Sequence, residues 1–200
     1  MLRKELYSNI LLGTSIIFWG VMGLKHYSFA ELTIVRIGSS ILNISVGVLI
    51  VLRQPARQLG SISSVIISLP SFIIGGLLFK LAQPFESWGG ALKVIFLFGV
   101  GFALISSIAL GKNFSIFPSI REISKKGPYK LVRHPIYSSE LLLASCCVFG
   151  NLNPISIILL LFFVCFLFLR INQEEKLLEN TSDYKKYQEK VKWKLIPGIW

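Results

Sequence analysis

The sequence has little charge for its length. Only 16% of its 200 residues are Asp, Glu, Lys or Arg, whereas 53% are hydrophobic and the mean hydropathy is +0.66. Soluble domains of ordinary composition carry about 25% charged residues. The composition therefore excludes an ordinary soluble domain and indicates an integral membrane protein.

Acidic residues are scarcer than basic ones. The chain has 10 Asp and Glu against 21 Lys and Arg, which gives a formal net charge of +11. The basic residues lie between and after apolar stretches and do not form one continuous polar face. We therefore expect no nucleic-acid partner, and we expect anionic lipid headgroups to be the partners of this charge.

Cysteine is rare, and histidine rarer. The three cysteines, Cys146, Cys147 and Cys165, sit in apolar runs without the spacing of metal ligands. A disulfide between the adjacent Cys146 and Cys147 would be strained. We expect three reduced packing residues and no metal site. His26 has no motif around it, so we expect an interfacial histidine there.

The sequence has no evident internal repeat or low-complexity segment, so we expect one domain over residues 1–200. We expect the first apolar run to stay as a helix and not to be a cleavable signal peptide. A window of about 20 residues for a membrane-spanning helix finds candidate spans in several places. They are residues 9–24, 32–52, 64–82, 91–110, 136–150 and 155–169. The last two flank a tight turn, Asn151 to Pro154, and therefore form a helical hairpin. The predicted fold is all-α, a polytopic membrane bundle of about six helices.

The C-terminal tail has a different pattern. From Asn172 to about Trp193, charged residues alternate with apolar ones at nearly helical spacing, which is typical of an interfacial amphipathic helix. The pattern is interrupted near Thr181 to Asp183, where Ser182 is a candidate cap for a second helical piece.

Lysine and arginine placement predicts the orientation. Basic residues crowd the connection before the fifth span and the tail, whereas the Asn151 to Pro154 turn carries no charge. Cytoplasmic loops are enriched in such residues. We expect both termini and both basic clusters in the cytoplasm of a bacterial inner membrane.

Two polar clusters flank the predicted hairpin. The first is the run from Gly127 to Tyr137, and the second is Arg170 with Glu174 and Glu175. Polar groups at a membrane boundary are costly to hold rigidly, and both clusters fall on the same predicted side. The sequence therefore predicts a single site at the membrane surface. The alternative to a functional site is that Lys130 and Arg133 anchor lipid headgroups and that the two glutamates begin a solvated tail.

About the last 90 residues resemble a family of membrane methyltransferases that includes isoprenylcysteine carboxyl methyltransferase and the phospholipid N-methyltransferases. The matching residues keep the order and spacing of the family pattern. They are Leu110 to Ser115, Gly127-Pro128-Tyr129, Arg133-His134-Pro135 with Tyr137, Arg170, Glu174-Glu175, Tyr184, Tyr187 and Ile196-Pro197-Gly198. The first four predicted spans contribute nothing to the resemblance beyond their hydropathy.

The resemblance implies an enzyme that binds S-adenosylmethionine on the cytoplasmic side, under a lid formed by the tail. Residues 1–110 would then be four N-terminal helices, and residues 111–200 would be the cofactor-binding core. The implied cofactor-binding residues are Arg121, Ser124, Tyr129, His134, Pro135, Tyr137 and Glu174. Arg170 would face a lipophilic substrate that enters from the bilayer. Family members often carry His where Arg121 stands and a longer stretch before the tyrosine pair.

The chemistry of these residues is compatible with that role. The ring faces of Tyr129 and Tyr137 could each hold a sulfonium cation by about 1 to 2 kcal/mol when desolvated. Methyl transfer needs an aligned nucleophile and exclusion of water, and no metal. Because Arg170 is permanently charged and forked, it suits a carboxylate or phosphate better than an amine, which favours carboxyl O-methylation. A prenylated thiol acid, a phospholipid amine, an isoprenoid acid and a quinone-like head all stay open as acceptors.

Two other classes of function remain. Membrane sterol reductases have a related Arg-His-x-Asn-Tyr-x-Gly-Glu signature, to be compared with Arg133 to Glu140 here, and that would imply an NADPH-dependent oxidoreductase. Pro135 and the upstream Gly127-Pro128-Tyr129 favour the methyltransferase. A membrane protein that has lost its activity is the third class, although the candidate cofactor residues are all present. The sequence does not indicate an oligomeric state.

Overall fold

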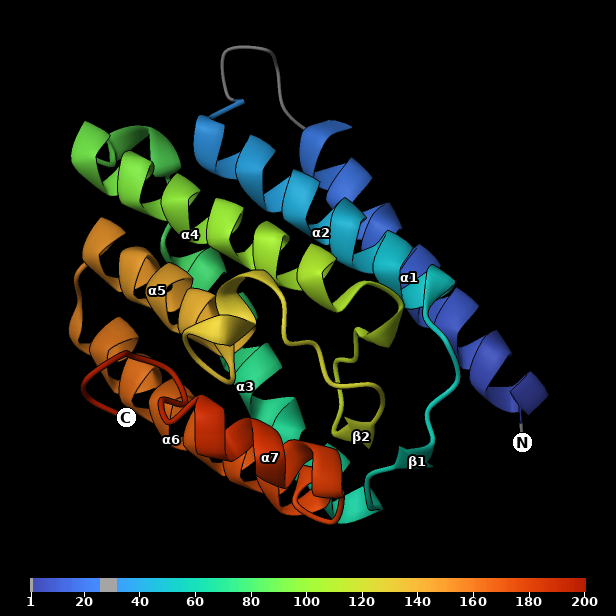
Figure 1. Ribbon diagram of the computed structural model, residues 1–200. Coiled ribbons are helices and arrows are strands. Elements are labelled where there is room, and N and C mark those ends of the chain that lie inside the picture. The colour runs from blue at the N-terminus through green and yellow to red at the C-terminus, as the bar shows by residue number, and fades with distance from the viewer. Residues whose placement is uncertain (1, 26–31) are drawn as a thin grey trace.

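The computed structural model describes residues 2–25 and 32–200, with side chains from residue 5 onward. His26 lies outside the described residues. The described chain is almost entirely helical, and its sheet is confined to two short strands. The helices are α1 (Leu2–Lys25), α2 (Ile34–Leu52), α3 (Ile62–Leu81), α4 (Gly90–Leu110), α5 (Pro135–Gly150), α6 (Pro154–Leu178) and α7 (Ser182–Lys190). The prediction of an all-α polytopic membrane bundle is confirmed (Figure 1).

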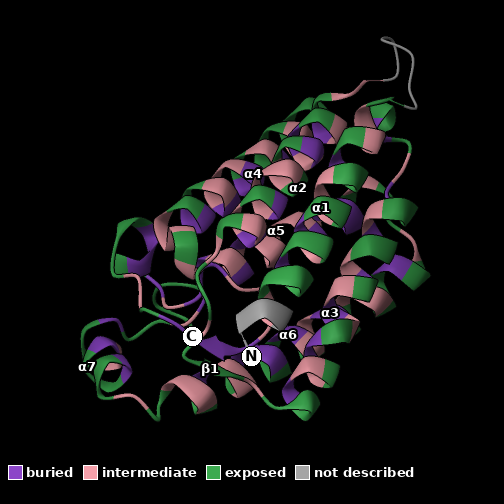
Figure 2. Ribbon diagram, turned by 90° about the vertical axis from the view of Figure 1, so that its right-hand side faces the viewer, coloured by how far each residue is buried: buried purple, intermediate pink, exposed green. Residues whose placement is uncertain are grey.

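Five of the described helices, α1 to α4 and α6, are long and apolar enough to cross a membrane. The helix α5 has 16 residues and is therefore about 24 Å long, somewhat less than the hydrocarbon core of about 30 Å. Figure 2 shows exposed residues along the outer faces of the long helices. Many of them are apolar, for example Leu11, Phe98 and Leu161. These faces suit contact with lipid chains.

Some helices pack against the next helix in the chain, whereas others pack against a helix further along it. In Figure 1, α1 lies beside α2, α2 beside α4, and α4 beside α5, while α3 packs against α6. Close approach of α1 and α2 depends on two glycines: a Cβ atom added at Gly13 would lie 2.7 Å from the carbonyl oxygen of Gly47. Larger residues at this crossing would push the two helices apart.

The hairpin of α5 and α6 begins and ends with clear local signals. Pro135 opens α5, where its missing N–H is not needed, and Asn153 caps α6 through a capping box with Ser156. The helix α6 ends at Leu178, so the predicted end at residue 169 is wrong. It continues because Arg170 and Glu175 are buried against other parts of the protein and are not released into solvent.

The tail after α6 forms the second helical piece that the sequence predicted. Thr181, not Ser182, is the N-cap residue of α7, so the predicted cap is shifted by one position. The Thr181 hydroxyl donates a hydrogen bond backwards to the carbonyl of Leu178, 2.7 Å away, and does not bond the first turn of α7. Cys146 and Cys147 are buried as predicted, whereas Cys165 is exposed on the outer face of α6.

The connection from α4 to α5 is irregular and ordered. It contains the turns η3 (Gly111–Asn113) and η4 (Gly127–Lys130) and the strand β2 (Ser119–Ile120). Strand β2 pairs antiparallel with β1 (Gln58–Leu59), between α2 and α3. The short turn η2 (Phe85–Ser87) lies at the opposite end of the bundle. Both predicted polar clusters therefore meet at one end, together with α7 (Figure 1).

Candidate functional site

A cavity of about 340 Å³ opens at this end of the bundle. It is lined by parts of α2, α4, the connection before α5, α5, α6 and α7. Its lining includes seven of the predicted site residues: Arg121, Ser124, Tyr129, His134, Tyr137, Arg170 and Glu174. Pro135 is fully buried and does not line the cavity, so its position fits the start of α5 and not a contact with a cofactor.

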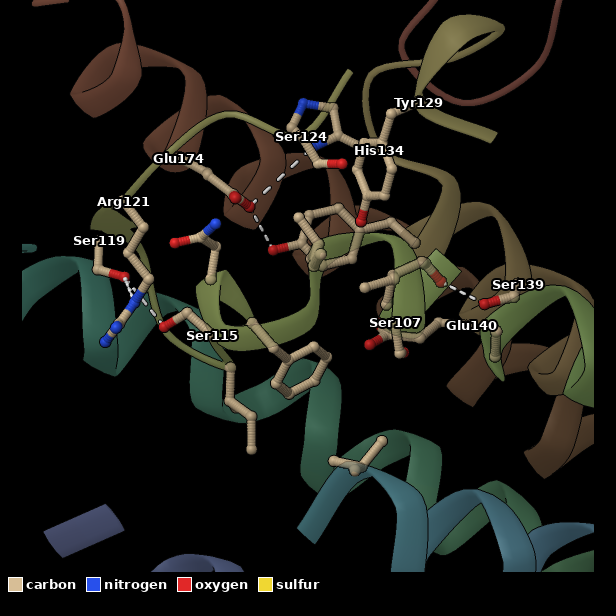
Figure 3. A pocket seen from close by; sticks show the side chains of 18 of the residues that line it. Ser107, Ser115, Ser119, Arg121, Ser124, Tyr129, His134, Ser139, Glu140 and Glu174 are labelled. Carbon is tan, nitrogen blue, oxygen red and sulfur yellow. Dashed lines mark hydrogen bonds and ion pairs between the residues drawn. The ribbon is translucent and has the colours of Figure 1, made fainter. Parts of the chain in front are cut away.

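Glu174 is the carboxylate that faces the cavity. Its side chain is 26% exposed, and Oε2 accepts a hydrogen bond from the Tyr137 hydroxyl. His134 Nδ1 lies 4.0 Å from the same oxygen, and the His134 ring stacks on Tyr137 with 5.4 Å between the ring centroids. Figure 3 shows Glu174 and His134 on one side of the cavity. One oxygen of a carboxylate in this position remains available to a ligand.

Glu175 is the next residue, yet it has a different environment. Its side chain is only 6% exposed, and Arg133 Nε lies 2.8 Å from Oε1. Lys194 Nζ lies 2.9 Å from Oε2, while His134 Nε2 and the Tyr184 hydroxyl each lie 3.1 Å from Oε1. The buried negative charge is thus fully surrounded by donors, which makes Glu175 a structural centre of this end.

The segment after α7 is tied across the start of α5. The backbone N–H of Arg133 donates to Trp193 O at 2.9 Å, and that of His134 donates to Lys194 O at 2.9 Å. The Arg133 guanidinium also donates to the carbonyl oxygen of Val191 at 2.9 Å. These bonds hold the segment after α7 against the start of α5.

The helix α7 contributes two tyrosines to the cavity wall. The Tyr187 hydroxyl donates to Tyr129 O at 2.6 Å. Burial, helped by the negative charge of Glu175, raises the pKa of Tyr184 well above its usual value, so this phenol stays neutral and keeps its hydrogen bond to Glu175. Tyr184, Tyr187 and Val191 form a small apolar cluster that seats α7.

Arg170 is almost completely buried at the inner end of the cavity. Its guanidinium carbon lies 4.2 Å from the centre of the Phe72 ring and 4.4 Å from that of Tyr137. NH1 donates to Glu140 Oε2 at 3.1 Å, and NH2 donates to Ile116 O at 2.9 Å. Both terminal nitrogens of Arg170, which we expected to face the substrate, are thus bonded within the protein, and Glu140 balances the charge.

Arg121 and Ser124 line the cavity, but their polar groups bond the protein. Arg121 NH2 lies 3.0 Å from the carboxylate of Glu5 in α1, and its Nε donates to Ser119 at 3.2 Å. Figure 3 shows the Arg121 side chain beside Ser119 and Ser115. Ser124 donates to Ala109 O at 2.7 Å. Both residues hold the connection in place, Arg121 against α1 and Ser124 against the end of α4.

The two tyrosines predicted to face a sulfonium differ in the structure. The ring of Tyr137 already contacts His134 and Arg170. Tyr129 is buried, lines the cavity, and projects into it from the turn η4 (Figure 3). Burial and the nearby Glu174 raise the pKa of Tyr129 well above its usual value, so its ring stays neutral. Tyr129 is the better candidate for a contact with a cation.

Three further polar residues, Glu140, Asn43 on α2 and Asn113, were not predicted from the sequence as site residues. All three line the cavity. Glu140 had a usable signal, because an acid within an apolar helix is a functional candidate by default. Asn43 had none, since an isolated amide in a long apolar run gives no hint of the cavity it borders.

The residues present fit S-adenosylmethionine. The volume lies within the range of about 300 to 1,000 Å³ that is typical of small-molecule sites. Glu174 offers an open acceptor for hydroxyl or ammonium groups, Tyr129 offers a ring for a sulfonium, and the apolar remainder of the wall suits an adenine.

Comparison with known proteins identifies a family that resembles part of the chain. No curated protein matches the chain. Residues 92–180 match the model of the isoprenylcysteine carboxyl methyltransferase (ICMT) family, which indicates a membrane methyltransferase with a lipid-like substrate. The matched segment runs from α4 to the end of α6 and contains every predicted site residue. Over this segment, which is somewhat less than half of its length, the chain is similar to the ICMT family.

Proposed function

We propose that the protein transfers a methyl group from S-adenosylmethionine to a lipophilic acceptor. The observation that carries this proposal is the pair of an open carboxylate, Glu174, and a neutral buried ring, Tyr129, in one cavity under α7. A sulfonium cofactor with hydroxyl and ammonium groups is the ligand that both groups recognise.

The bound cofactor supplies a methyl group that is already activated for displacement. Glu174 would accept hydrogen bonds from its hydroxyl or ammonium groups, and Tyr137 and His134 hold that carboxylate in position. The Tyr129 ring would lie next to the sulfonium. The helix α7 and the tail exclude water, which keeps the reacting groups aligned and desolvated.

The acceptor enters from the bilayer through a second cavity. This cavity has a volume of about 320 Å³ and lies among α2, α3, α4, α5 and α6, with mostly apolar walls. It shares five lining residues with the first cavity: Leu42, Asn43, Phe72, Glu140 and Leu143. A lipid tail in the second cavity would bring its headgroup to the junction, beside Arg170. A carboxylate headgroup, as the family name implies, is one candidate there.

The basic end of the protein is proposed to face the cytoplasm of a bacterial inner membrane. The connection before α5 and the tail carry most of the lysines, and they lie at the end that holds the cavity. Positive residues are retained on the cytoplasmic side. The cofactor, a cytoplasmic metabolite, would then reach the site directly.

Equilibrium binding of S-adenosylmethionine to the detergent-purified protein tests the proposal. We expect binding that weakens at least about tenfold in Glu174→Gln, because a charged hydrogen-bond acceptor contributes about 1.5 to 3 kcal/mol. Glu189→Gln, an exposed position on α7, is the matched control and should bind like the wild type. Binding of NADPH in place of S-adenosylmethionine would support the sterol-reductase alternative. Binding of neither would favour a protein without enzymatic activity.

A further inference from the structure

We propose that Glu140 takes a proton from the acceptor, so that the methylated headgroup is a protic nucleophile, a phenol, hydroxyl or amine, and not a carboxylate. This inference rests on the proposed function and specifies its substrate class. It starts from the position of Glu140 at the junction of the two cavities, three residues after Tyr137 on α5.

The Glu140 carboxylate is accessible from the cavities, whereas its partner is not. The Glu140 side chain is 28% exposed, compared with 2% for Arg170. Figure 3 shows Glu140 on the opposite side of the cavity from Glu174. A headgroup that arrives from the apolar cavity therefore meets Glu140 before it can meet the guanidinium.

Glu140 has unused capacity to accept hydrogen bonds. Its Oε2 accepts from Arg170 NH1 at 3.1 Å, and within residues 5–25 and 32–200 no other donor bonds this side chain. An ionised carboxylate has about four acceptor positions. Oε1 is thus free to accept a proton-bearing group, and the bond from Arg170 orients the carboxylate.

The charges at the junction disfavour an anionic headgroup. Arg170 is paired with Glu140, its NH2 group bonds Ile116 O at 2.9 Å, and the Phe72 and Tyr137 rings flank its plane. A carboxylate acceptor would have to displace Glu140 or lie beside it, and Glu174 adds a second negative charge across the cavity. Like charges at close range in a desolvated site cost several kcal/mol. Hydroxyl and amine headgroups carry no such penalty.

The step balances with these groups alone. The lone pair of the headgroup oxygen or nitrogen forms a bond to the methyl carbon while the bond from that carbon to sulfur breaks. The electron pair of the broken bond stays on sulfur, which becomes a neutral thioether. The proton of the nucleophile passes to Glu140 Oε1 and leaves to water after product release. Arg170 is a positioning residue in this scheme, since it acts through Glu140.

A binding comparison tests the headgroup class without any need for turnover. Three lipids that share one alkyl chain and end in a phenol, a primary amine or a carboxylate are titrated into the wild-type protein. We expect the phenol and the amine to bind at least about tenfold more tightly than the carboxylate. Glu140→Gln keeps the shape of the side chain but loses its charge, so it should reduce the difference in affinity between these lipids. Glu86→Gln at the opposite end of the bundle is the matched control. Tightest binding of the carboxylate by the wild type would overturn the inference.

Kinetic measurements then show whether Glu140 acts as a general base or has only a structural role. With a protic acceptor, we expect Glu140→Gln to lower kcat about 10²- to 10⁴-fold and to abolish the acid limb of the pH profile, with unchanged affinity for S-adenosylmethionine. An unchanged kcat or pH profile would refute the role of Glu140. Failure of the wild type to bind S-adenosylmethionine would instead refute the proposed function, and the lipid comparison would still decide the headgroup preference.

Discussion

At the scale of single residues, two neighbouring acids have opposite environments. Glu174 is open to the cavity, whereas Glu175 is surrounded by Arg133, His134 and Lys194. Successive residues on a helix point about 100° apart, so the two carboxylates cannot share one environment. The sequence analysis chose Glu174 for the cofactor. The sequence did not reveal the role of Glu175, because its partners come from distant parts of the chain.

The ring of Tyr129 is expected to distinguish a sulfonium from a thioether. Tyr129→Leu removes the aromatic face, so we expect affinity for S-adenosylmethionine to fall by about 0.5 to 2 kcal/mol, or roughly 2- to 30-fold. S-adenosylhomocysteine lacks the positive charge, and its affinity should change much less. Calorimetric titration of both ligands measures the difference.

Tyr129→Phe keeps the ring and is the matched control. It should retain most of the preference for the charged ligand. Equal losses for the two ligands in Tyr129→Leu would show that Tyr129 contributes shape and not a cation contact.

At the scale of elements, the tail is the segment that the sequence described least well. The amphipathic pattern predicted helical structure after residue 172, but it did not indicate that the first part continues α6. Nor did it predict that the backbone of Trp193 and Lys194 would bond Arg133 and His134. Such bonds depend on chain segments meeting in space, which periodicity does not encode.

Glu175 is expected to control whether this tail stays bound. Glu175→Gln removes the charge and leaves Arg133 and Lys194 without their counter-ion, a change that typically costs about 3 to 5 kcal/mol for a buried pair. We expect the tail to become a site of rapid limited proteolysis. Glu174→Gln, one position away, should leave the tail protected. Equal protection in both variants would contradict the structural role of Glu175.

Gly150, the last residue of α5, tests the packing at the end of the bundle that is remote from the cavity. A Cβ atom at Gly150 would lie 2.1 Å from Trp88 Cε2, and Trp88 is buried with its indole N–H bonded to Ala82 O at 2.9 Å. We expect Gly150→Ala to destabilise the protein by about 1 to 3 kcal/mol, seen as a lower thermal unfolding midpoint.

Gly101 in α4 is the matched control, because a Cβ atom there would meet nothing within 4 Å. Gly101→Ala should be neutral or stabilising by about 0.5 to 1 kcal/mol. A stable Gly150→Ala would show that α5 ends further from Trp88 than the structure places it.

At the scale of the whole molecule, hydropathy was sufficient to predict the bundle. The family resemblance predicted seven of the residues that line the cavity. The sequence could not predict how Arg170 is used. A charge on an apolar helix predicts a function, but its partner Glu140 on another helix decides whether the charge is free. Arg121 is similar, since only the fold brings Glu5 of α1 to it.

The proposed orientation of the molecule predicts which end can be labelled from outside the cell. With the three native cysteines replaced, Asn151→Cys at the uncharged turn should react with a membrane-impermeant maleimide in intact cells. Lys186→Cys in α7 should react only after permeabilisation. The reverse pattern would place the cavity outside the cytoplasm and contradict the proposed route of the cofactor.

The most direct test of the whole account is an experimental structure of the protein with S-adenosylhomocysteine. The account predicts the ligand in the cavity under α7, with a polar group bonded to Glu174, its sulfur next to the Tyr129 ring and directed toward the junction at Glu140. A ligand bound elsewhere, or one whose sulfur faces away from Glu140 and Arg170, would contradict it.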